Sequence, residues 1–283
     1  LTVRGPITAG QFIRRAGSDL TAGSLALSAK EYLTPACIGV AAALGYATVR
    51  VYPLPRVGIF SSGDELVPVG TTPLPYQSFE SNTWALNAAC RQYAIRNATI
   101  VRTADDRAAI EAALDPLIAA NDLVLITGGV SVGDHDHIKP ALAALGAEIV
   151  FWRVRQRPGK PLLCAHRGTT LILGLPGNPV STLTCFYLYA TQAVHKMTQS
   201  SPWPLRQRTA RLTAPVTGLA DLTQFVRGWL RPDSDDQWIV TPQAQQGSHQ
   251  LSALAHSNVL IELPEEARDY GEGDEVKCLR ISR

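Results

Sequence analysis

The sequence of 283 residues predicts an α/β fold, with a doubly wound and mostly parallel sheet followed by a small β domain. Two observations lead to this prediction. Between positions 56 and 197, short apolar runs alternate with stretches whose apolar residues recur at helical spacing. From about position 208 the helical spacing fades, and only strand-like runs remain. The apolar fraction of 46% is enough for a large packed core in a chain of this length.

The expected elements follow in order along the chain. Residues 1–54 hold short β-prone pieces such as 23–27, an alanine-rich helix around 35–44 and a strand at 46–52. Apolar runs then predict strands at 56–60, 98–102, 122–127, 147–154, 161–165 and 169–174. Helical spacing predicts the helices between them, at 81–94, 105–120, 139–145 and in a long stretch after Pro179. Strand-like runs return at 225–231, 237–242, 258–263 and 275–281.

We expect three parts in the chain. Residues 1–54 form an N-terminal α+β segment, residues 55–200 the α/β domain, and residues 206–283 a small C-terminal β-barrel domain. The stretch 198–208 is rich in proline and serine, which predicts a linker between the last two parts.

The charge and the cysteine content argue against several classes of function. The formal net charge of +2 provides no overall field that would attract nucleic acid or a membrane surface. No apolar stretch is long enough to span a membrane, and nothing resembles a signal peptide. The five cysteines are far apart and contain no CxxC pair, so neither a zinc site nor a disulfide framework is predicted. We expect a cytoplasmic protein with reduced cysteines, in which any anion binding comes from a local cluster.

The segment 174–181, GLPGNPVS, joins a short buried strand to a helix. Asn178 stands at the expected N-cap and Pro179 at the first helical position, while Gly177 leaves no side chain between the backbone and a ligand. Free N–H groups at such a helix start can hold an anion. The alternative is a well-capped connection without a ligand, and this segment alone does not decide between the two.

Two more loops leave strand ends with the same small and hydroxyl-bearing residues. They are SSGDE at 61–65 and GGVSVGDHD at 128–136. Ligands of an open α/β sheet bind beyond the carboxyl ends of its strands. We therefore expect a phosphate-bearing ligand across the three loops. The expected contacts in the second loop are Gly128, Gly129, Ser131 and Gly133.

Four carboxylates belong to these loops: Asp64, Glu65, Asp134 and Asp136. They could hold a divalent ion that bridges phosphate oxygens. The alternative is that they serve turns and helix starts, where aspartate is common. His135 and His137 flank Asp136, but no other histidine or cysteine is near in sequence. Exposed or packed histidines are therefore favoured over a transition-metal site.

Two cations surround a predicted turn at 157–161, RPGKP. Arg157 is a planar fork and Lys160 a point charge, and both suit a phosphate or an oxyanion. A solvated turn is the alternative. Ser181 lies in the first turn of the following helix, where its hydroxyl could contact a ligand or cap the helix. No GxSxG elbow is present, so a serine nucleophile is not predicted.

Taken together, these motifs resemble the MoeA family of molybdopterin molybdenumtransferases, which is related to the E domain of gephyrin. The resemblance runs in order over nearly the whole chain, and the combination of motifs is specific. The segments that carry it are SSGDEL (61–66), SNTWAL (81–86), TGGVSVGDHD (127–136), RPGKPL (157–162), GLPGNPVS (174–181), QFVRG (224–228) and QGSHQLSAL (246–254). The α/β domain would then have the fold of the MogA and MoaB proteins.

The resemblance implies metal insertion: adenylylated molybdopterin and molybdate react, AMP is released, and molybdenum ends on the dithiolene of the pterin. It implies a site that depends on Mg²⁺, with Asp64, Glu65 and Asp136 as acidic metal-binding residues and Asp105 or Asp106 as another. Further contacts to phosphate or molybdate are implied for the catalytic Lys160 and for Arg157, Gly177, Asn178 and Ser181, and molybdate-side contacts for Arg227 and Ser248 from the β domain.

The resemblance also implies partners, and this sequence differs from the family pattern at a few positions. Family members act as homodimers, carry a further upstream region that helps wall the site, and use the product of a MogA-type adenylyltransferase. Residues 1–54 would be the remnant of that region, so that this chain alone would bind nucleotide but turn over poorly. Arg157 stands where the family has lysine, and His135 and His137 replace aromatic residues.

Two other functions remain open. One is the related MogA-like adenylyltransferase activity, against which stand the PGKP and GLPGNPVS motifs and the added β domain. The other is a scaffold without catalysis, as in the receptor-clustering role of gephyrin. A pure scaffold need not keep Asp64, Asp136, Lys160 and Arg227 together, and this chain has all four.

Overall fold

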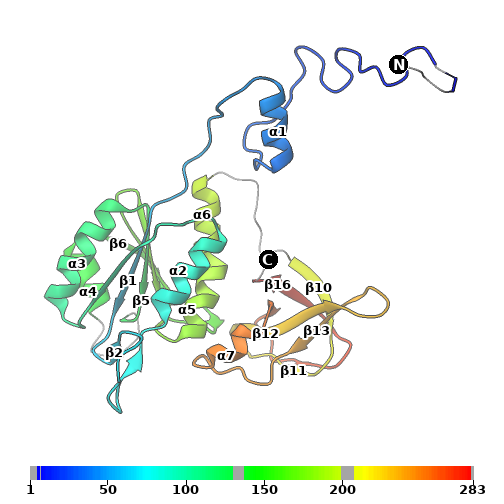
Figure 1. The fold of residues 1–283 in the computed structure, drawn as a ribbon. Helices are drawn as coiled ribbons and strands as arrows, with labels where there is room; N and C mark the ends of the chain where they lie inside the picture. The colour runs from blue at the N-terminus through cyan, green and yellow to red at the C-terminus, as the bar shows by residue number, and fades with distance from the viewer. Residues whose placement is uncertain (1–4, 7, 130–136, 199–206, 282–283) are drawn as a thin grey trace. The chain divides into compact units, whose positions relative to one another are not determined.

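The computed structural model describes residues 5, 6, 8–129, 137–198 and 207–281. The described residues form two compact units, one of the residues up to Tyr52 and one of the residues from Pro53 onward (Figure 1). In the part of the chain that is described, no helix is long and apolar enough to cross a membrane.

The first unit contains one helix, α1 (Pro35–Ala43), as the sequence predicts. Thr34 caps it, because its hydroxyl accepts a hydrogen bond from the N–H of Cys37 at 3.2 Å. The predicted strands at 23–27 and 46–52 are wrong: neither stretch forms a strand. Tyr46 and Val51 are both 65% exposed. β-prone residues adopt a strand only where a neighbouring strand and a buried face support them.

The second unit begins with a six-stranded sheet in the order β4-β1-β5-β9-β8-β6. Its strands are β1 (Val57–Ser62), β4 (Thr99–Thr103), β5 (Leu123–Thr127), β6 (Glu148–Trp152), β8 (Leu163–Arg167) and β9 (Thr170–Leu175). Strands β4, β1, β5 and β9 pair in parallel, whereas β8 is antiparallel to both of its neighbours. The prediction of a mostly parallel sheet is confirmed.

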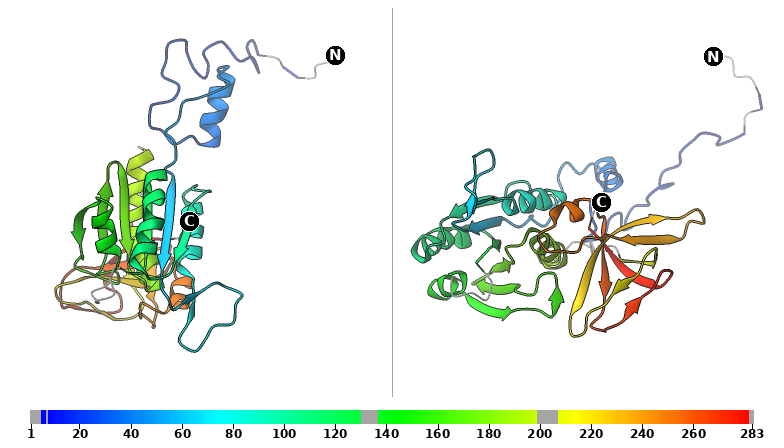
Figure 2. Two further views of the ribbon diagram at one scale, coloured as in Figure 1. Left: turned by 90° about the vertical axis from the view of Figure 1, so that its left-hand side faces the viewer. Right: turned by 90° about the horizontal axis from the view of Figure 1, so that it is seen from below.

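Helices cover both faces of this sheet, as the ribbon views show (Figures 1 and 2). Alternate residues of each strand point to opposite faces: in β5, Leu125 joins one core and Ile126 the other. The first core includes helix α2 (Asn82–Gln92), α5 (Pro179–Cys185), the π-helical segment η1 (Phe186–Ala190) and α6 (Thr191–Thr198). The second includes α3 (Arg107–Ala120) and α4 (Ile138–Ala144). The sheet is therefore doubly wound.

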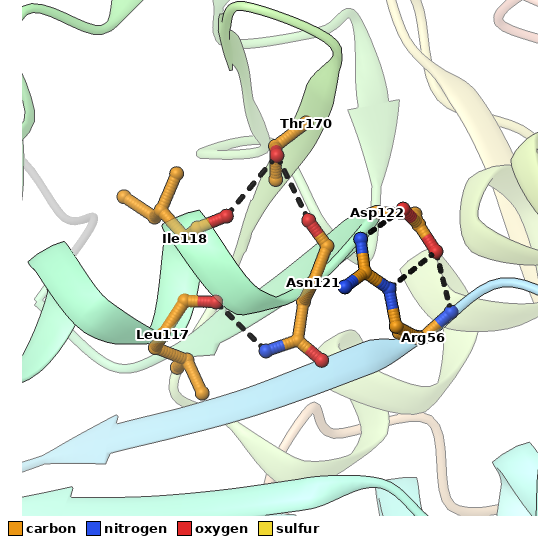
Figure 3. A network of polar contacts seen from close by, with 6 residues as sticks. All are labelled: Arg56, Leu117, Ile118, Asn121, Asp122 and Thr170. Carbon is orange, nitrogen blue, oxygen red and sulfur yellow. Dashed lines mark hydrogen bonds and ion pairs between the residues drawn. The ribbon is translucent and has the colours of Figure 1, made fainter.

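The amino ends of the sheet strands are tied by a polar network (Figure 3). The guanidinium of Arg56 donates to both carboxylate oxygens of Asp122, at 3.2 and 2.9 Å. This contact holds the pKa of Asp122 below its ordinary value. The hydroxyl of Thr170 donates to the carbonyls of Ile118 and Asn121. The network lies at the edge opposite to the strand ends where a ligand is expected.

The C-terminal part is a closed β-barrel of five strands, β10-β16-β14-β12-β13, because β13 pairs with both β12 and β10. The strands are β10 (Gln207–Leu212), β12 (Thr223–Pro232), β13 (Trp238–Pro242), β14 (Val259–Leu263) and β16 (Glu275–Arg280). Strand β10 is a correction, since the predicted linker overlaps its first residues and no strand was predicted there. Thr198, the first residue of the predicted linker, ends α6, and residues 199–206 lie outside the described residues.

Short elements complete the second unit: β2 (Leu66–Val67), β3 (Ser78–Phe79), β7 (Gln156–Arg157), β11 (Val216–Thr217), β15 (Asp269–Tyr270) and α7 (Leu251–Ala255). Strand β7, although it belongs to the α/β part of the sequence, pairs with β12 of the barrel. The two parts also share a core, in which Phe225 and Leu260 of the barrel join Phe186 of η1. This shared core joins the barrel to the α5–η1 side of the α/β domain.

Candidate functional site

Two carboxylates meet at the carboxyl ends of β1 and β4. Asp64 follows β1, and one of its carboxylate oxygens accepts the backbone N–H of Asp105 at 3.0 Å. The hydroxyl of Ser62, the last residue of β1, donates to the carboxylate of Asp105 at 3.3 Å. A cavity of about 380 Å³ opens beside Asp64, between the ends of β1 and β4 and the segment 66–68. The carboxylate of Asp64 therefore lines a strand-end cavity, and Asp105 contacts Asp64 through its backbone N–H.

The structure distinguishes Asp105 from its neighbour Asp106. Asp106 is the N-cap of α3, where its carboxylate accepts the N–H of Ala109 at 2.9 Å. Glu65 is exposed, and its backbone carbonyl accepts the N–H of Ser78 at 2.8 Å. Asp105 is thus the acidic partner of Asp64 at this edge.

Part of the predicted site lies outside the described residues: Ser131, Gly133, Asp134, His135 and Asp136. His137, which is described, precedes α4 at its N-cap position. Within the described ranges, no group of three or more histidine, cysteine or acidic side chains could hold a metal ion.

The glycines of the strand-end loops bring the three loops into contact. Gly128 follows β5 with φ +89°, and a Cβ there would lie 2.9 Å from the carbonyl oxygen of Ser62. A Cβ on Gly177 would lie 3.5 Å from the Cα of Gly128. Gly129 has φ +63°, and a Cβ there would meet Ile138 at 2.7 Å. Only glycine permits this conformation and this approach together.

Asn82, which sequence reasoning left without a role, fastens two of these loops. From the first turn of α2 its side-chain amide donates to the hydroxyl of Thr127 at 2.8 Å and to the carbonyl of Gly177 at 2.7 Å. Its amide oxygen is buried and has no hydrogen-bond partner among the described residues. The only signal in the sequence was its place in the SNTWAL motif.

Helix α5 begins as predicted, with Asn178 at the N-cap and Pro179 in the first turn. The side chain of Asn178 makes no capping hydrogen bond, whereas its carbonyl accepts the N–H of Thr182 at 2.9 Å. The N–H of Val180 donates to the carbonyl of Ser248, from the barrel loop, at 3.2 Å. The expectation of free N–H groups is therefore wrong for Val180, because Ser248 accepts its proton. Ser181 is buried, with 4% of its surface exposed.

The RPGKP turn at 157–161 begins on strand β7, which pairs with strand β12 of the barrel. Arg157 is paired in register with Gln224 of β12, and the two strands run in parallel. The chain therefore leaves β7 in the direction in which β12 runs towards Arg227. Arg157 and Lys160 are exposed, and neither forms an ion pair within the described ranges. Gly159 between them has φ +100°.

Arg227 is a buried cation without a described carboxylate beside it. It is 1% exposed, and its guanidinium donates to the carbonyls of Gln245 at 2.6 Å and Gly247 at 3.3 Å. Its Nε has no partner among the described residues, and burial lowers the pKa of Arg227. Carbonyls satisfy donors but leave the charge unneutralised, so this place favours an anion. Ser248 follows Gly247 directly.

Sequence reasoning also missed Glu80, a buried acidic residue in the wall of the cavity beside Asp64. The carboxylate of Glu80, 3% exposed, accepts the N–H of Thr83 at 2.8 Å and the Nε of Arg102 at 3.0 Å. Glu80 thereby accepts a backbone N–H in the first turn of α2, and both Glu80 and the half-exposed Arg102 line the cavity. No sequence pattern links these residues, because they come from different elements.

Family models match two parts of the chain. The model described as "Probable molybdopterin binding domain" matches residues 58–196. The model described as "MoeA C-terminal region (domain IV)" matches residues 209–281. A doubly wound domain with converging strand-end loops, joined to a closed barrel, thus defines a two-domain protein of the molybdopterin-binding class.

Individual relatives are also similar to this chain. The molybdopterin molybdenumtransferase 2 of Mycobacterium tuberculosis is 36% identical over 98% of this chain and 69% of its own length. The molybdopterin molybdenumtransferase of Haemophilus influenzae is 32% identical over 94% and 66%. A crystal structure of the molybdopterin biosynthesis MoeA protein of Pyrococcus horikoshii matches with a TM-score of 0.80 at 25% identity, over 94% of this chain and 64% of that one.

The chain belongs to the MoeA family, whose curated members named above are molybdopterin molybdenumtransferases. The resemblance stated from the motifs is confirmed, and with it the expected transferase class and a role in molybdenum cofactor biosynthesis. The chain spans about two thirds of the length of these relatives, 69% and 66%.

Proposed function

We propose that this chain inserts molybdenum into adenylylated molybdopterin, consuming molybdate and releasing AMP. The observation that carries the proposal is a continuous row of contacts along the carboxyl edge of the sheet. It runs from Asp64 and Asp105 through Gly128 and Gly177 to the start of α5, and from there to Ser248 of the barrel loop. The row is acidic at one end, and at the other the buried cation Arg227 holds the same barrel loop.

The acidic end fits a divalent cation. Asp64 and Asp105 are oxygen ligands of the kind that Mg²⁺ prefers, and one oxygen of Asp64 is already ordered by the N–H of Asp105. Asp64, Asp105 and, by family resemblance, Asp136 and Glu65 would hold this ion. When bound, Mg²⁺ would neutralise charge on the phosphate linkage. Thr103 and Arg102 in the cavity wall can contact the same ligand.

The cationic end fits an oxyanion. Arg227 has an Nε in a buried place without a partner among the described residues, and Ser248 follows Gly247, whose carbonyl accepts from the same guanidinium. Lys160 and Arg157 lie on a turn that runs in the same direction along β12. Fixed donors around a tetrahedral anion bind it without reorganisation, which suits molybdate. The phosphate would lie between the two ends, against the backbone of Gly128, Gly129 and Gly177. The buried hydroxyl of Ser181 lies near the start of α5.

We also propose a homodimer in the cytoplasm that receives its substrate from a MogA-type adenylyltransferase. The support is the family resemblance together with the chemistry, since an adenylylated substrate has to come from an adenylyl transfer. Light scattering of the purified chain measures the mass of the assembly, and a monomer at working concentration would contradict the homodimer.

The function is tested by AMP release from adenylylated molybdopterin in the presence of molybdate and Mg²⁺. Asp64→Asn and Asp105→Asn should each lower the rate by at least about 100-fold while leaving the fold intact, because each removes a charged ligand. Asp106→Asn is the matched control, since asparagine is an equally good N-cap, and it should release AMP at the normal rate.

Each result separates the candidate functions. Equal rates for the Asp105 and Asp106 variants would contradict the assignment of Asp105. Release of pyrophosphate from ATP and molybdopterin, without molybdate, would identify an adenylyltransferase instead. A folded chain that binds neither AMP nor molybdate would support a scaffold.

A further inference from the structure

The RPGKP turn is supported by a polar pair that none of the predicted roles uses, the buried Gln156 and the partly buried Tyr189. Gln156, directly before the turn, is 3% exposed. Its side-chain amide donates to the carbonyl of Pro158 inside the turn at 2.9 Å. Its amide oxygen accepts the hydroxyl proton of Tyr189, which belongs to η1. One side chain therefore connects the turn to the helical segment that follows α5.

The turn is also pressed against the end of α5. Gly159 has φ +100°, and a Cβ there would lie 2.5 Å from the sulfur of Cys185 and 2.6 Å from the Nε2 of Gln156. Cys185 is fully buried. Prolines on both sides of Gly159 restrict the backbone of the turn. The backbone between the two cations therefore has little freedom to move relative to α5.

Tyr189 is placed for this contact by an irregular helix. The segment Phe186–Ala190 is π-helical between the α-helices α5 and α6. Such segments are rare and concentrate at functional sites. Burial raises the pKa of Tyr189 to about 12, so its hydroxyl keeps its proton and donates at neutral pH.

The hydrogen-bonded pair of Gln156 and Tyr189 lies beside an apolar core, where an apolar pair would also fit. The surroundings are apolar, with Cys185 and Phe186 in the same core. An apolar pair of similar shape would be about as stable, because buried hydrogen bonds contribute little net stability once both partners are removed. The pair fixes an orientation that an apolar contact would leave free, since hydrogen bonds are directional.

We propose that Gln156 and Tyr189 are positioning residues that hold the RPGKP turn on α5 and so set the affinity of Lys160 for the oxyanion. The proposal rests on the proposed function, in which Lys160 contacts molybdate. Neither residue touches the ligand. They act because the same continuous helical stretch carries Ser181 in its first turn and Tyr189 two turns further along, so that the turn and the helix start keep one geometry.

The test is a double-mutant cycle on molybdate binding, measured by equilibrium dialysis below the melting temperature. Lys160→Ala should weaken molybdate binding by about 30-fold, as expected for a lost charge-assisted contact. Tyr189→Phe should weaken it by about tenfold in the otherwise unchanged chain, because a small misplacement of a binding group is costly. In the Lys160→Ala background, Tyr189→Phe should change the affinity by less than about twofold.

Two further variants separate positioning from stability. Tyr187→Phe is the matched control: the same change in the same segment, on a ring that packs edge-on against Phe186, and it should leave molybdate affinity unchanged. The variant Gln156→Met with Tyr189→Phe removes both polar partners. Because it leaves the half-buried carbonyl of Pro158 without its donor, it should lower the stability by no more than about 1–3 kcal/mol, whereas its molybdate affinity should stay about tenfold lower. If the pair served stability alone, the double variant would bind molybdate with the affinity of the unchanged chain.

The outcomes for the two proposals differ. If Lys160→Ala leaves molybdate binding intact, the role of Lys160 in the proposed function is refuted, and the positioning proposal with it. If Lys160→Ala weakens binding but Tyr189→Phe does not, only the positioning proposal is overturned. It is equally overturned if Tyr189→Phe weakens binding to the same extent in both backgrounds.

Discussion

Arg227 provides the sharpest test of how the barrel contributes to the site. Its side chain is 1% exposed and its guanidinium donates to the carbonyls of Gln245 and Gly247. We consider Arg227→Met, which keeps an unbranched apolar stem and removes the charge and the donors. Arg231→Met is the control, because Arg231 lies exposed on the same strand, β12.

The effect on stability should be small, because two large contributions oppose each other. A carbonyl left without its donor costs about 1–3 kcal/mol, and Gly247 is the less exposed of the two. Removing a buried charge that has no counter-ion among the described residues recovers several kcal/mol of desolvation. We expect a net change within about 2 kcal/mol, which corresponds to a shift of the melting temperature within about 8 °C.

The effect on binding should be large and selective. A hydrogen bond to a charged group is worth about 1.5–3 kcal/mol, so molybdate affinity should fall about 10- to 100-fold. AMP affinity should stay within about twofold, because the strand-end glycines come from the other domain. Parallel titrations with molybdate and AMP measure both. Equal weakening of the two ligands, or unchanged molybdate binding, would refute the role of Arg227 in holding the oxyanion.

Three further predictions concern other parts of the molecule. Gly128→Ala should cost about 2–5 kcal/mol of stability in denaturant unfolding and weaken AMP binding, because its φ is +89° and a Cβ would meet the carbonyl of Ser62 at 2.9 Å. Gly168→Ala, also at positive φ but in open space, should cost only about 1–2 kcal/mol and leave AMP binding unchanged. Asp122, whose pKa is lowered by Arg56, should contribute stability above its unfolded pKa that is lost as the pH falls through the folded value. Its asparagine variant should therefore be less stable than the unchanged chain near pH 6, and the difference should shrink below about pH 4; a difference independent of pH would contradict this. Three cysteine residues, Cys90, Cys185 and Cys278, are fully buried, and burial raises the pKa of each of their thiols. In the folded chain these thiols should resist a thiol reagent at pH 8 and react after denaturation, and fast labelling of any of them without denaturant would show that its burial is wrong.

The parts of the fold that were predictable are those with a local pattern. The doubly wound sheet follows from apolar runs and helical spacing, both of which can be read within one element. Strand β10 was missed because its sequence QRTARL has few apolar residues, and only Ala210 and Leu212 are buried. Strand β7 has two residues and exists through its pairing with β12, far along the chain. The stretch 46–52 has strand propensity but no partner.

The candidate site was predictable to the same extent. The strand-end loops carry glycines, hydroxyls and carboxylates that a pattern can identify, and the loops do converge. The sequence could not separate Asp105 from Asp106, since only the start of α3 shows which of them is the cap. Asn82 was missed because its partners are 45 and 95 residues away. Hydrogen bonds between distant side chains leave no periodic trace in a sequence.

The proposed site contains three cationic side chains, and contacts with neutral groups position the segments that carry them. Arg157, Lys160 and Arg227 have no described carboxylate to hold them, and like charges repel. Hydrogen bonds to neutral carbonyls hold the guanidinium of Arg227, and packing of Gly159 holds the backbone of the turn that carries Arg157 and Lys160. The contacts of both segments lead back to one helical stretch. Its first turn binds the barrel loop through Val180 and Ser248, its last α-helical residue, Cys185, packs on Gly159, and Tyr189 holds Gln156. This helical stretch therefore fixes the backbone of the turn and of the barrel loop in one arrangement, and groups that are fixed in advance bind an anion without reorganisation.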